Sequence, residues 1–304
     1  MKRIKQNKDC GWSKSWLVLW VAIIALALAA CGGGGGGGED ASGGGGGLVV
    51  VVVGGGGEEE DASGGGVPLE PVEEPVILGQ AGPGDVGNHI PFTVGNVWRF
   101  QGTVTVTGLP PKNFVNTITI TETRLVNGVN VTVFQDTNPS NLGVPEETFL
   151  VKDVNGIADF GNNDPTDIIT PQLVPFWEIR FPLETGSSFI QVDRKGIALG
   201  DDLDGDGIND LFDISSVVKM IGFEPVTVPV GTFANCAKIE QHAEFIFIMS
   251  SDGTRIPSNT VLTLWFAPNI GWVKKMVVLS APSLEFTETS TEELIGFEVD
   301  GQTG

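Results

Sequence analysis

The sequence predicts an all-β domain over residues 86–304, folded as an antiparallel sandwich or a curved half-barrel, after a disordered N-terminal tether. Three observations predict it. Val, Ile, Thr and Phe dominate from about residue 90 onward, and Gly, Pro and Asn interrupt them at short intervals. Several runs alternate apolar and polar residues, as in half-buried strands. Asn127-Gly128, between two such runs, is typical of a two-residue hairpin turn with positive φ.

The strands expected from these patterns are short and closely spaced, and only a possible helical turn near Leu211 interrupts them. About 210 residues suit one domain, or two closely packed halves. Asp252-Gly253 is a second turn signal. The expected strands are 97–107, 116–124, 129–135, 146–152, 189–192, 215–221, 236–250, 261–267, 271–279 and 284–286.

One pattern occurs twice, at residues 90–98 and 181–189: apolar, Pro, apolar, two residues, Gly, two residues, aromatic. Each copy indicates a Pro-started turn, with Gly freeing the backbone, that leads into a strand. We interpret the two copies as similar turns before strands rather than as a duplication.

Residues 1–30 have the pattern of a bacterial lipoprotein signal peptide. Five basic residues precede the uncharged run from Trp16 to Ala30, which is short for a membrane-spanning helix. The run ends in Leu28-Ala29-Ala30-Cys31, which resembles a lipobox, and this resemblance implies that Cys31 carries the lipid. An ordinary signal peptide or an N-terminal membrane anchor is the alternative. Gly32 follows Cys31 where an Asp would imply retention at an inner membrane, so we expect anchoring at the outer membrane.

Residues 31–85 are expected to form a flexible tether. The segment is rich in Gly and acidic residues, and Glu39-Asp40-Ala41-Ser42-Gly43-Gly44-Gly45 recurs as residues 60–66. Val49–Val53 is an exception that could pair with a sheet edge or simply be an apolar interruption of a coil.

The charge excludes some classes of partner. The 304 residues carry 17 Lys and Arg against 38 Asp and Glu, a net charge of −21, which argues against nucleic acid. Without residues 1–30, which hold five basic residues and one acidic residue, the balance is 12 minus 37, or −25. So acidic a chain would meet the membrane only through acyl chains on Cys31. Three Cys and two His are too few for a zinc-ribbon or iron–sulfur protein.

Three segments of the domain resemble a family of uncharacterised bacterial exported proteins. These are residues 90–100 (IPFTVGNVWRF), 228–236 (VPVGTFANC) and 265–274 (WFAPNIGWVK). The family has an "FPLxxGxxW" opening, a "VPAGTFxxC" strand and a late "WxAPGxGxVK" hairpin. Val230 and Asn269 depart from its usual Ala and Gly. The resemblance implies an antiparallel β fold outside the cytoplasm and no particular reaction.

One constellation carries recognisable chemistry, the acidic loop from Asp202 to Asp213 (DLDGDGINDLFD). Its spacing matches a twelve-residue calcium loop, in which carboxylates alternate and a Gly at position 6 permits a sharp bend. The loop resembles those of dockerin, thrombospondin type-3 and EF-hand proteins. We expect structural Ca²⁺, and we expect the Ile208 side chain to anchor the loop in the core. The predicted ligands are Asp202, Asp204, Asp206, the Ile208 carbonyl, Asp210 and Asp213.

Other candidates are weaker. We expect Cys236 to be a small buried hydrophobe, too far along its strand from His242 to form a catalytic pair. His89 is expected at the surface. The four tryptophans of the β region could line a sugar- or lipid-binding face but are expected in the core: Trp98, Trp177, Trp265 and Trp272.

The function expected from these observations is that of a non-enzymatic, membrane-anchored lipoprotein of the bacterial cell envelope. Its calcium-stabilised β domain would bind an unknown protein, glycan or lipid partner, or an apolar ligand in a concave pocket. A calcium-dependent surface adhesion module is the alternative. An envelope hydrolase is a third reading, but no catalytic residues are identified.

Overall fold

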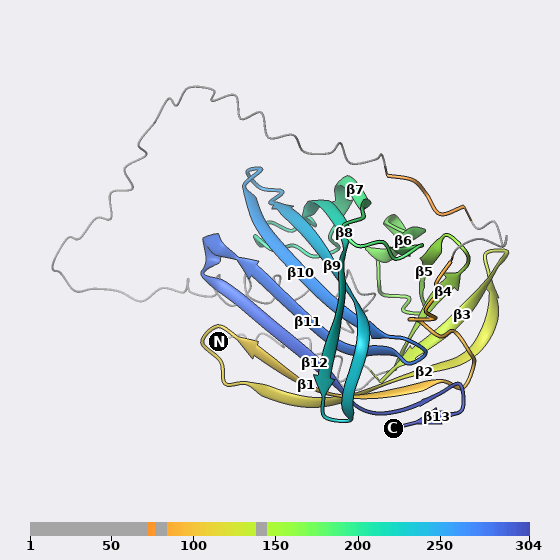
Figure 1. Cartoon of the computed structure of the whole chain (residues 1–304). Helices are drawn as coiled ribbons and strands as arrows, with labels where there is room; N and C mark the ends of the chain where they lie inside the picture. The colour runs from red at the N-terminus through yellow and green to blue at the C-terminus, as the bar shows by residue number, and fades with distance from the viewer. Residues whose placement is uncertain (1–71, 77–83, 138–144) are drawn as a thin grey trace, which may run out of the picture.

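The structure, a computed structural model, describes residues 72–76, 84–137 and 145–304. The predicted signal peptide, Cys31, Val49–Val53 and most of the predicted tether lie outside these residues. The prediction of an all-β antiparallel domain is confirmed, and the sheet curves into a nearly closed barrel rather than a sandwich (Figure 1).

The barrel is made of two six-stranded meanders in which consecutive strands pair antiparallel. The first consists of β1 (Val97–Val106), β2 (Lys112–Val126), β3 (Val129–Asp136), β4 (Glu146–Lys152), β5 (Gly156–Asn162) and β6 (Phe176–Arg180). The second consists of β7 (Ser188–Ala198), β8 (Leu211–Val228), β9 (Gly231–Ile248), β10 (Arg255–Ala267), β11 (Gly271–Ala281) and β12 (Phe286–Val299). The other described elements are the 3-10 turns η1 (Thr170–Gln172) and η2 (Pro282–Leu284) and the short β13 (Gln302–Thr303).

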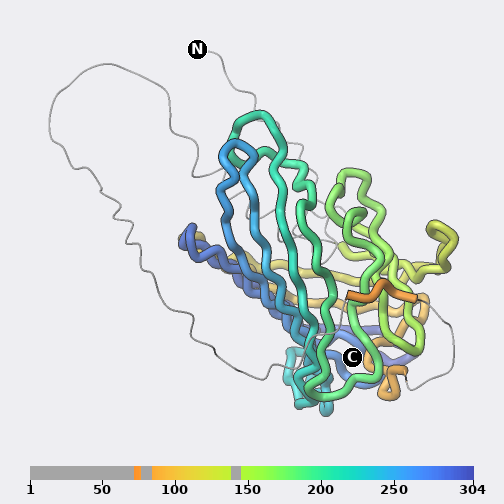
Figure 2. Tube along the Cα trace, turned by 90° about the horizontal axis from the view of Figure 1, so that it is seen from above, coloured from red at the N-terminus to blue at the C-terminus, as the bar shows by residue number. Residues whose placement is uncertain are grey.

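The two meanders join along β1 and β12, which pair antiparallel from Val97↔Glu298 to Val106↔Glu288. The two ends of the sheet, β6 and β7, follow one another in sequence, yet no backbone ladder joins them. Viewed from above, the strands of the second meander form one wall, and those of the first curve round toward it (Figure 2). We call the unjoined line between β6 and β7 the seam.

The two Pro-Gly-aromatic motifs lead into β1 and β7, the first strand of each meander, and their backbones bond alike. Gly95 N–H donates to the Ile120 carbonyl (2.8 Å), and Gly186 N–H donates to the Met220 carbonyl (2.8 Å). The N–H of Ile120 and of Met220 donates back to the residue after each glycine. Both glycines have positive φ, +97° and +86°, which explains why each motif needs Gly there.

The predicted hairpin turns are confirmed, and two local predictions are wrong. Asn127 (φ +49°) and Gly128 (φ +85°) join β2 to β3. Leu211 starts β8 instead of a helical turn. Residues 282–284 form η2, so β12 begins only at Phe286.

The predicted core tryptophans are confirmed, since all four are buried. Trp98 and Trp272 meet edge to face, with ring centroids 5.3 Å apart. The Trp98 indole N–H also donates to the Ile270 carbonyl at 2.6 Å, which ties β1 to the turn between β10 and β11. The large core therefore unites the two meanders on the inner face of the sheet.

Residues 84–92 lead into the barrel and are held by a buried carboxylate. Asp85 accepts the backbone N–H groups of His89 (2.9 Å) and Ile90 (3.0 Å), and its Oδ2 lies 3.0 Å from Lys152 Nζ. The expectation that His89 lies at the surface is wrong: it is 7% exposed, because its ring packs against Phe223 and toward Asp85. In the described residues the only helices are 3-10 turns, and none has the length and hydrophobicity of a membrane span.

Candidate metal centre

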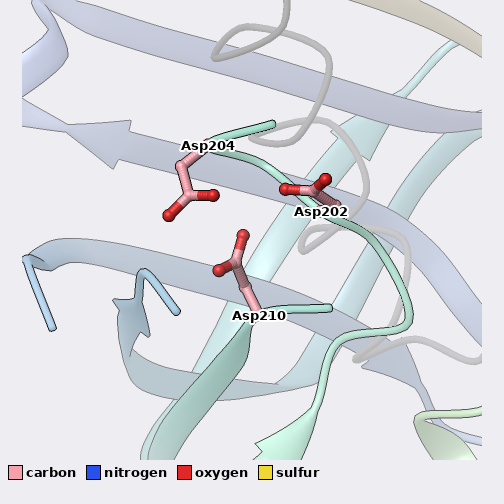
Figure 3. A group of neighbouring side chains, drawn as sticks. All are labelled: Asp202, Asp204 and Asp210. Atoms are coloured by element: carbon pink, nitrogen blue, oxygen red, sulfur yellow. The ribbon is translucent and has the colours of Figure 1, made fainter. Parts of the chain in front are cut away.

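Three carboxylates of the acidic loop converge between β7 and β8. Asp202 and Asp204 lie in the loop itself, and Asp210 directly precedes β8. One oxygen from each lies within 4.8 Å of the others. The three side chains point toward a common space (Figure 3). We call these residues the aspartate trio.

The loop folds tightly because its carboxylates accept hydrogen bonds from its own backbone. Asp202 Oδ1 accepts from Gly205 N–H (2.6 Å), and its Oδ2 accepts from Gly207 N–H (2.8 Å). Gly207 has a φ of +91°, so the predicted requirement for Gly at the sharp bend is confirmed. Asp210 has no exposed surface, and its Oδ2 accepts from Leu203 N–H (2.6 Å), which closes the loop.

A second segment, the turn between β9 and β10, packs against the trio. Asp204 Oδ2 accepts from the Ser251 hydroxyl at 2.7 Å, and Asp210 Oδ1 accepts from Ser250 N–H at 2.7 Å. The hydrogen bond from Ser251 is the largest influence on Asp204 and lowers the pKa of its carboxyl, so it is ionised at neutral pH. The loop thereby links the connection after β7 to a turn 40 residues further along the chain.

The trio has the donor chemistry and spacing that a hard divalent cation requires. Ca²⁺ takes oxygen ligands at about 2.3–2.6 Å, so two oxygens on opposite sides of one ion lie roughly 4.6–5.2 Å apart. The three oxygens lie within 4.8 Å of one another, which is close enough for all three to reach one ion. The trio accepts hydrogen bonds from backbone N–H groups and a serine hydroxyl, and these neutral donors leave the negative charges in place. Like charges at this distance repel, and a bound cation would remove the repulsion.

The other two predicted carboxylate ligands, Asp206 and Asp213, have partners outside the trio. Both Asp206 oxygens accept hydrogen bonds, from Ile208 N–H (2.7 Å) and from the Ser250 hydroxyl (2.9 Å). Asp213 lies within β8, where a 2.6 Å ion pair with Arg255 and a bond from Gly196 N–H hold it. The Arg255 hydrogen bond is the main reason that the pKa of Asp213 is lowered.

The expectation that the Ile208 side chain anchors the loop in the core is wrong. It is 61% exposed, and its carbonyl faces the Ser250 hydroxyl at 3.4 Å. Asp210 provides the buried anchor instead. Asp213, the twelfth residue of the predicted calcium loop, lies in a strand, because β8 begins two residues before it.

Sequence reasoning missed Ser250 and Ser251, which hold Asp204, Asp206 and Asp210 from outside the loop. The sequence marks these two serines only through the adjacent Asp252-Gly253 turn signal, which predicts that they lie at the tip of a hairpin. That signal does not predict that the tip packs against an acidic loop 40 residues earlier.

Cys236 behaves as predicted. It has no exposed surface, and burial raises the pKa of its thiol to about 11, which leaves little thiolate at neutral pH. His242 is exposed and lies 3.2 Å from Glu240.

No family model and no curated protein matches the chain. Two solved structures are similar to about two thirds of it. One, a provisionally assigned lipoprotein of Parabacteroides distasonis, is 16% identical, with 68% of this chain and 97% of that chain covered and a TM-score of 0.34. The other, a provisionally assigned exported protein with a YmcC-like fold from Bacteroides fragilis, is 14% identical, with 70% and 97% covered and a TM-score of 0.31.

Proposed function

We propose that the chain is a non-enzymatic lipoprotein of the bacterial cell envelope, anchored at the outer membrane through acyl chains on Cys31. Its barrel is stabilised by one Ca²⁺ and binds a partner or ligand. The observation that carries the calcium proposal is the convergence of Asp202, Asp204 and Asp210 against the β9–β10 turn.

The role proposed for the ion is structural. The trio joins two connections that lie apart in sequence, residues 199–210 and the turn at Ser250 and Ser251. An ion that binds only the folded arrangement stabilises it by mass action. The loop is flanked by β7 and β8, without the paired helices that change angle in calcium sensors.

The anchoring proposal rests on the sequence of residues 1–32. The basic start, the uncharged run and Cys31 agree with a lipobox, and two or three acyl chains contribute about 0.8 kcal/mol per buried methylene. Cys31→Ser should move the protein from the membrane fraction to the soluble fraction and abolish labelling with a radioactive fatty acid. Membrane retention and labelling of that variant would contradict the anchoring proposal.

Calcium binding is tested by isothermal titration of the full chain in detergent. We expect one site with a dissociation constant on the order of 10⁻⁴–10⁻³ M, as in extracellular modules. Asp204→Ala should abolish the heat, since it removes one of three convergent ligands. Glu244→Gln removes an exposed carboxylate of β9 outside the loop and should bind normally. Equal binding by the wild type and Asp204→Ala would refute the site.

A further inference from the structure

A buried polar cluster on the inner face of the sheet brings together a lysine, a glutamate and an asparagine. Lys275 lies on β11, Glu292 on β12 and Asn116 on β2. Lys275 and Glu292 are direct neighbours across the β11–β12 ladder, and β1 separates β12 from β2. Asn116 is 3% exposed and Glu292 is 6% exposed. The cluster therefore spans the line of β1 and β12 along which the two meanders join.

The carboxylate of Glu292 contacts both of the other side chains. Its Oε1 lies 2.8 Å from Lys275 Nζ, and its Oε2 accepts from Asn116 Nδ2 at 3.3 Å. The amine and the amide meet across two intervening strands because the sheet is curved (Figure 1). A carboxylate within hydrogen-bond distance of two nitrogens can carry protons from one to the other.

The other partners of Asn116 polarise its amide. The Thr137 hydroxyl donates to Asn116 Oδ1 at 2.9 Å, and Asn116 Nδ2 also donates to Asp136 Oδ2 at 3.1 Å. A donor at the carbonyl oxygen stabilises the negative charge that develops there when a nucleophile adds to the carbon. The amide is thus arranged as an electrophile, with proton carriers beside its nitrogen.

Lys275 belongs to the same cluster, because the charge of Asp136 acts on it. Burial would lower the pKa of Lys275, but the charge of Glu292, its hydrogen bond and the charge of Asp136 outweigh burial and raise that pKa. The resting lysine is therefore an ammonium. Glu292, which lies 2.8 Å away, is placed to take one of its protons and so release a nucleophilic amine.

We propose that Lys275 and Asn116 form an intramolecular amide cross-link, with Glu292 as the proton carrier. The Lys275 ammonium transfers a proton to Glu292, and the lone pair of Nζ attacks Cγ of Asn116. The Cγ–Nζ bond forms, and the Cγ–Nδ2 bond breaks as Glu292 protonates Nδ2. Nζ keeps one hydrogen, and its other two leave with Nδ2 as an ammonium ion. The step therefore needs no oxidant, reductant or cofactor.

The bond would join β11 to β2 and so tie the two meanders together covalently across β12 and β1. Like a disulfide, it would restrict the unfolded chain and so favour the folded one. The reaction occurs once in each molecule and modifies only the chain itself. It goes beyond the proposed function and depends on neither the calcium site nor the lipid anchor.

The test is tryptic peptide mapping, by mass spectrometry, of the full chain purified in detergent. Trypsin cleaves after Lys and Arg, so an unmodified chain yields residues 113–124 and 276–304 as separate peptides. The cross-link blocks cleavage after Lys275. We therefore expect residues 113–124 joined to residues 275–304, with a mass lower than that of the two peptides together by one ammonia.

Two lysine variants assign the nucleophile. Lys275→Met should abolish the joined peptide. Lys274→Met is the matched control, because Lys274 makes the same 2.8 Å ion pair, with Glu293, on the opposite face of the sheet. That variant should leave Asn116 and Lys275 joined. Absence of the joined peptide from the folded wild-type chain would overturn the proposal, and so would its persistence in Lys275→Met.

A third variant keeps the test valid if Lys275→Met fails to fold. Glu292→Gln preserves the shape of the side chain, and a cooperative thermal melt would show that it folds. It should leave most of the chain unjoined, because loss of a general acid–base group slows a reaction on the order of a hundredfold or more. Complete joining in Glu292→Gln would overturn the role of Glu292. A bond from Lys275 to Asp136, formed with loss of water and found in residues 125–152, would overturn the choice of Asn116.

Discussion

Replacing Asp85 by Asn should destabilise the barrel strongly, because the Asp85 carboxylate ties the start of the domain to β4. It accepts two backbone N–H bonds and lies 3.0 Å from Lys152 Nζ. Burial alone would raise the pKa of Asp85, but hydrogen bonds from His89 and the attraction of Lys152 outweigh it and hold this pKa well below its usual range. The folded state therefore depends on the ionised form.

The magnitude follows from burial of the pair. Breaking a buried ion pair from one side costs about 3–5 kcal/mol. The Asp85 side chain is 2% exposed and that of Lys152 is 19% exposed, so we expect the lower end, about 3 kcal/mol. For a domain of this size each kcal/mol shifts the melting temperature by about 2–4 °C, which gives a loss of roughly 6–12 °C.

The assay is a thermal melt of wild type and Asp85→Asn at pH 7 and at pH 3. A lowered carboxyl pKa stabilises the fold above the unfolded value of about 3.9, and that contribution fades as the pH falls toward the folded value. At pH 3 the difference between the two proteins should therefore shrink by roughly 1 kcal/mol. A double-mutant cycle with Lys152→Met isolates the coupling. A loss of about 1 °C or less at pH 7, or an equal loss at both pH values, would refute this reasoning.

Three further predictions concern the core. Gly102→Ala should lower the free energy of unfolding by about 1–3 kcal/mol, because the added Cβ would lie 2.1 Å from the Phe114 ring. In a thermal melt, adding Phe114→Leu should restore part of that stability. An unchanged melting temperature in Gly102→Ala would contradict this close packing. Trp98→Phe should lower the free energy of unfolding, measured with denaturant, by about 2 kcal/mol, since it leaves the buried Ile270 carbonyl without its hydrogen-bond donor. An unchanged denaturation midpoint would count against that hydrogen bond. Cys236 should resist iodoacetamide at pH 8 until denaturant is added, because burial raises the pKa of its thiol to about 11 in the folded protein. Mass spectrometry of the peptide that contains Cys236 measures the labelling. Rapid labelling of the folded protein would show that the thiol is accessible.

Local patterns predicted much of this fold. Asn127-Gly128 marks a hairpin through backbone conformation alone, and the alternation around Trp98 marks β1 because one face is apolar. Two strands of the meanders, β5 and β6, were not predicted, and β12, which joins the two meanders, was predicted only at its first residue, Phe286. Its inner face carries Glu288, Ser290 and Glu292, so the polar-apolar alternation of a half-buried strand is absent. A strand with a polar inner face is recognisable only once its neighbours are known.

The acidic loop likewise combines features that its own sequence predicts with contacts that depend on distant strands. The spacing of Asp202, Asp204 and Gly207 is local, and the structure brings the first two together with Asp210. The partners at Ser250 and Ser251 depend on how β8, β9 and β10 pair, which no motif within the loop encodes. Asp213 was predicted as a ligand because it is the twelfth residue of the loop pattern, but in the structure it forms an ion pair with Arg255.

The claim that the aspartate trio holds Ca²⁺ is tested most directly by a crystal structure of the full chain grown with calcium, measured for anomalous scattering. One anomalous peak is expected about 2.3–2.6 Å from a carboxylate oxygen of each of Asp202, Asp204 and Asp210. An ordered loop with no peak there, from crystals grown in millimolar calcium, would contradict it.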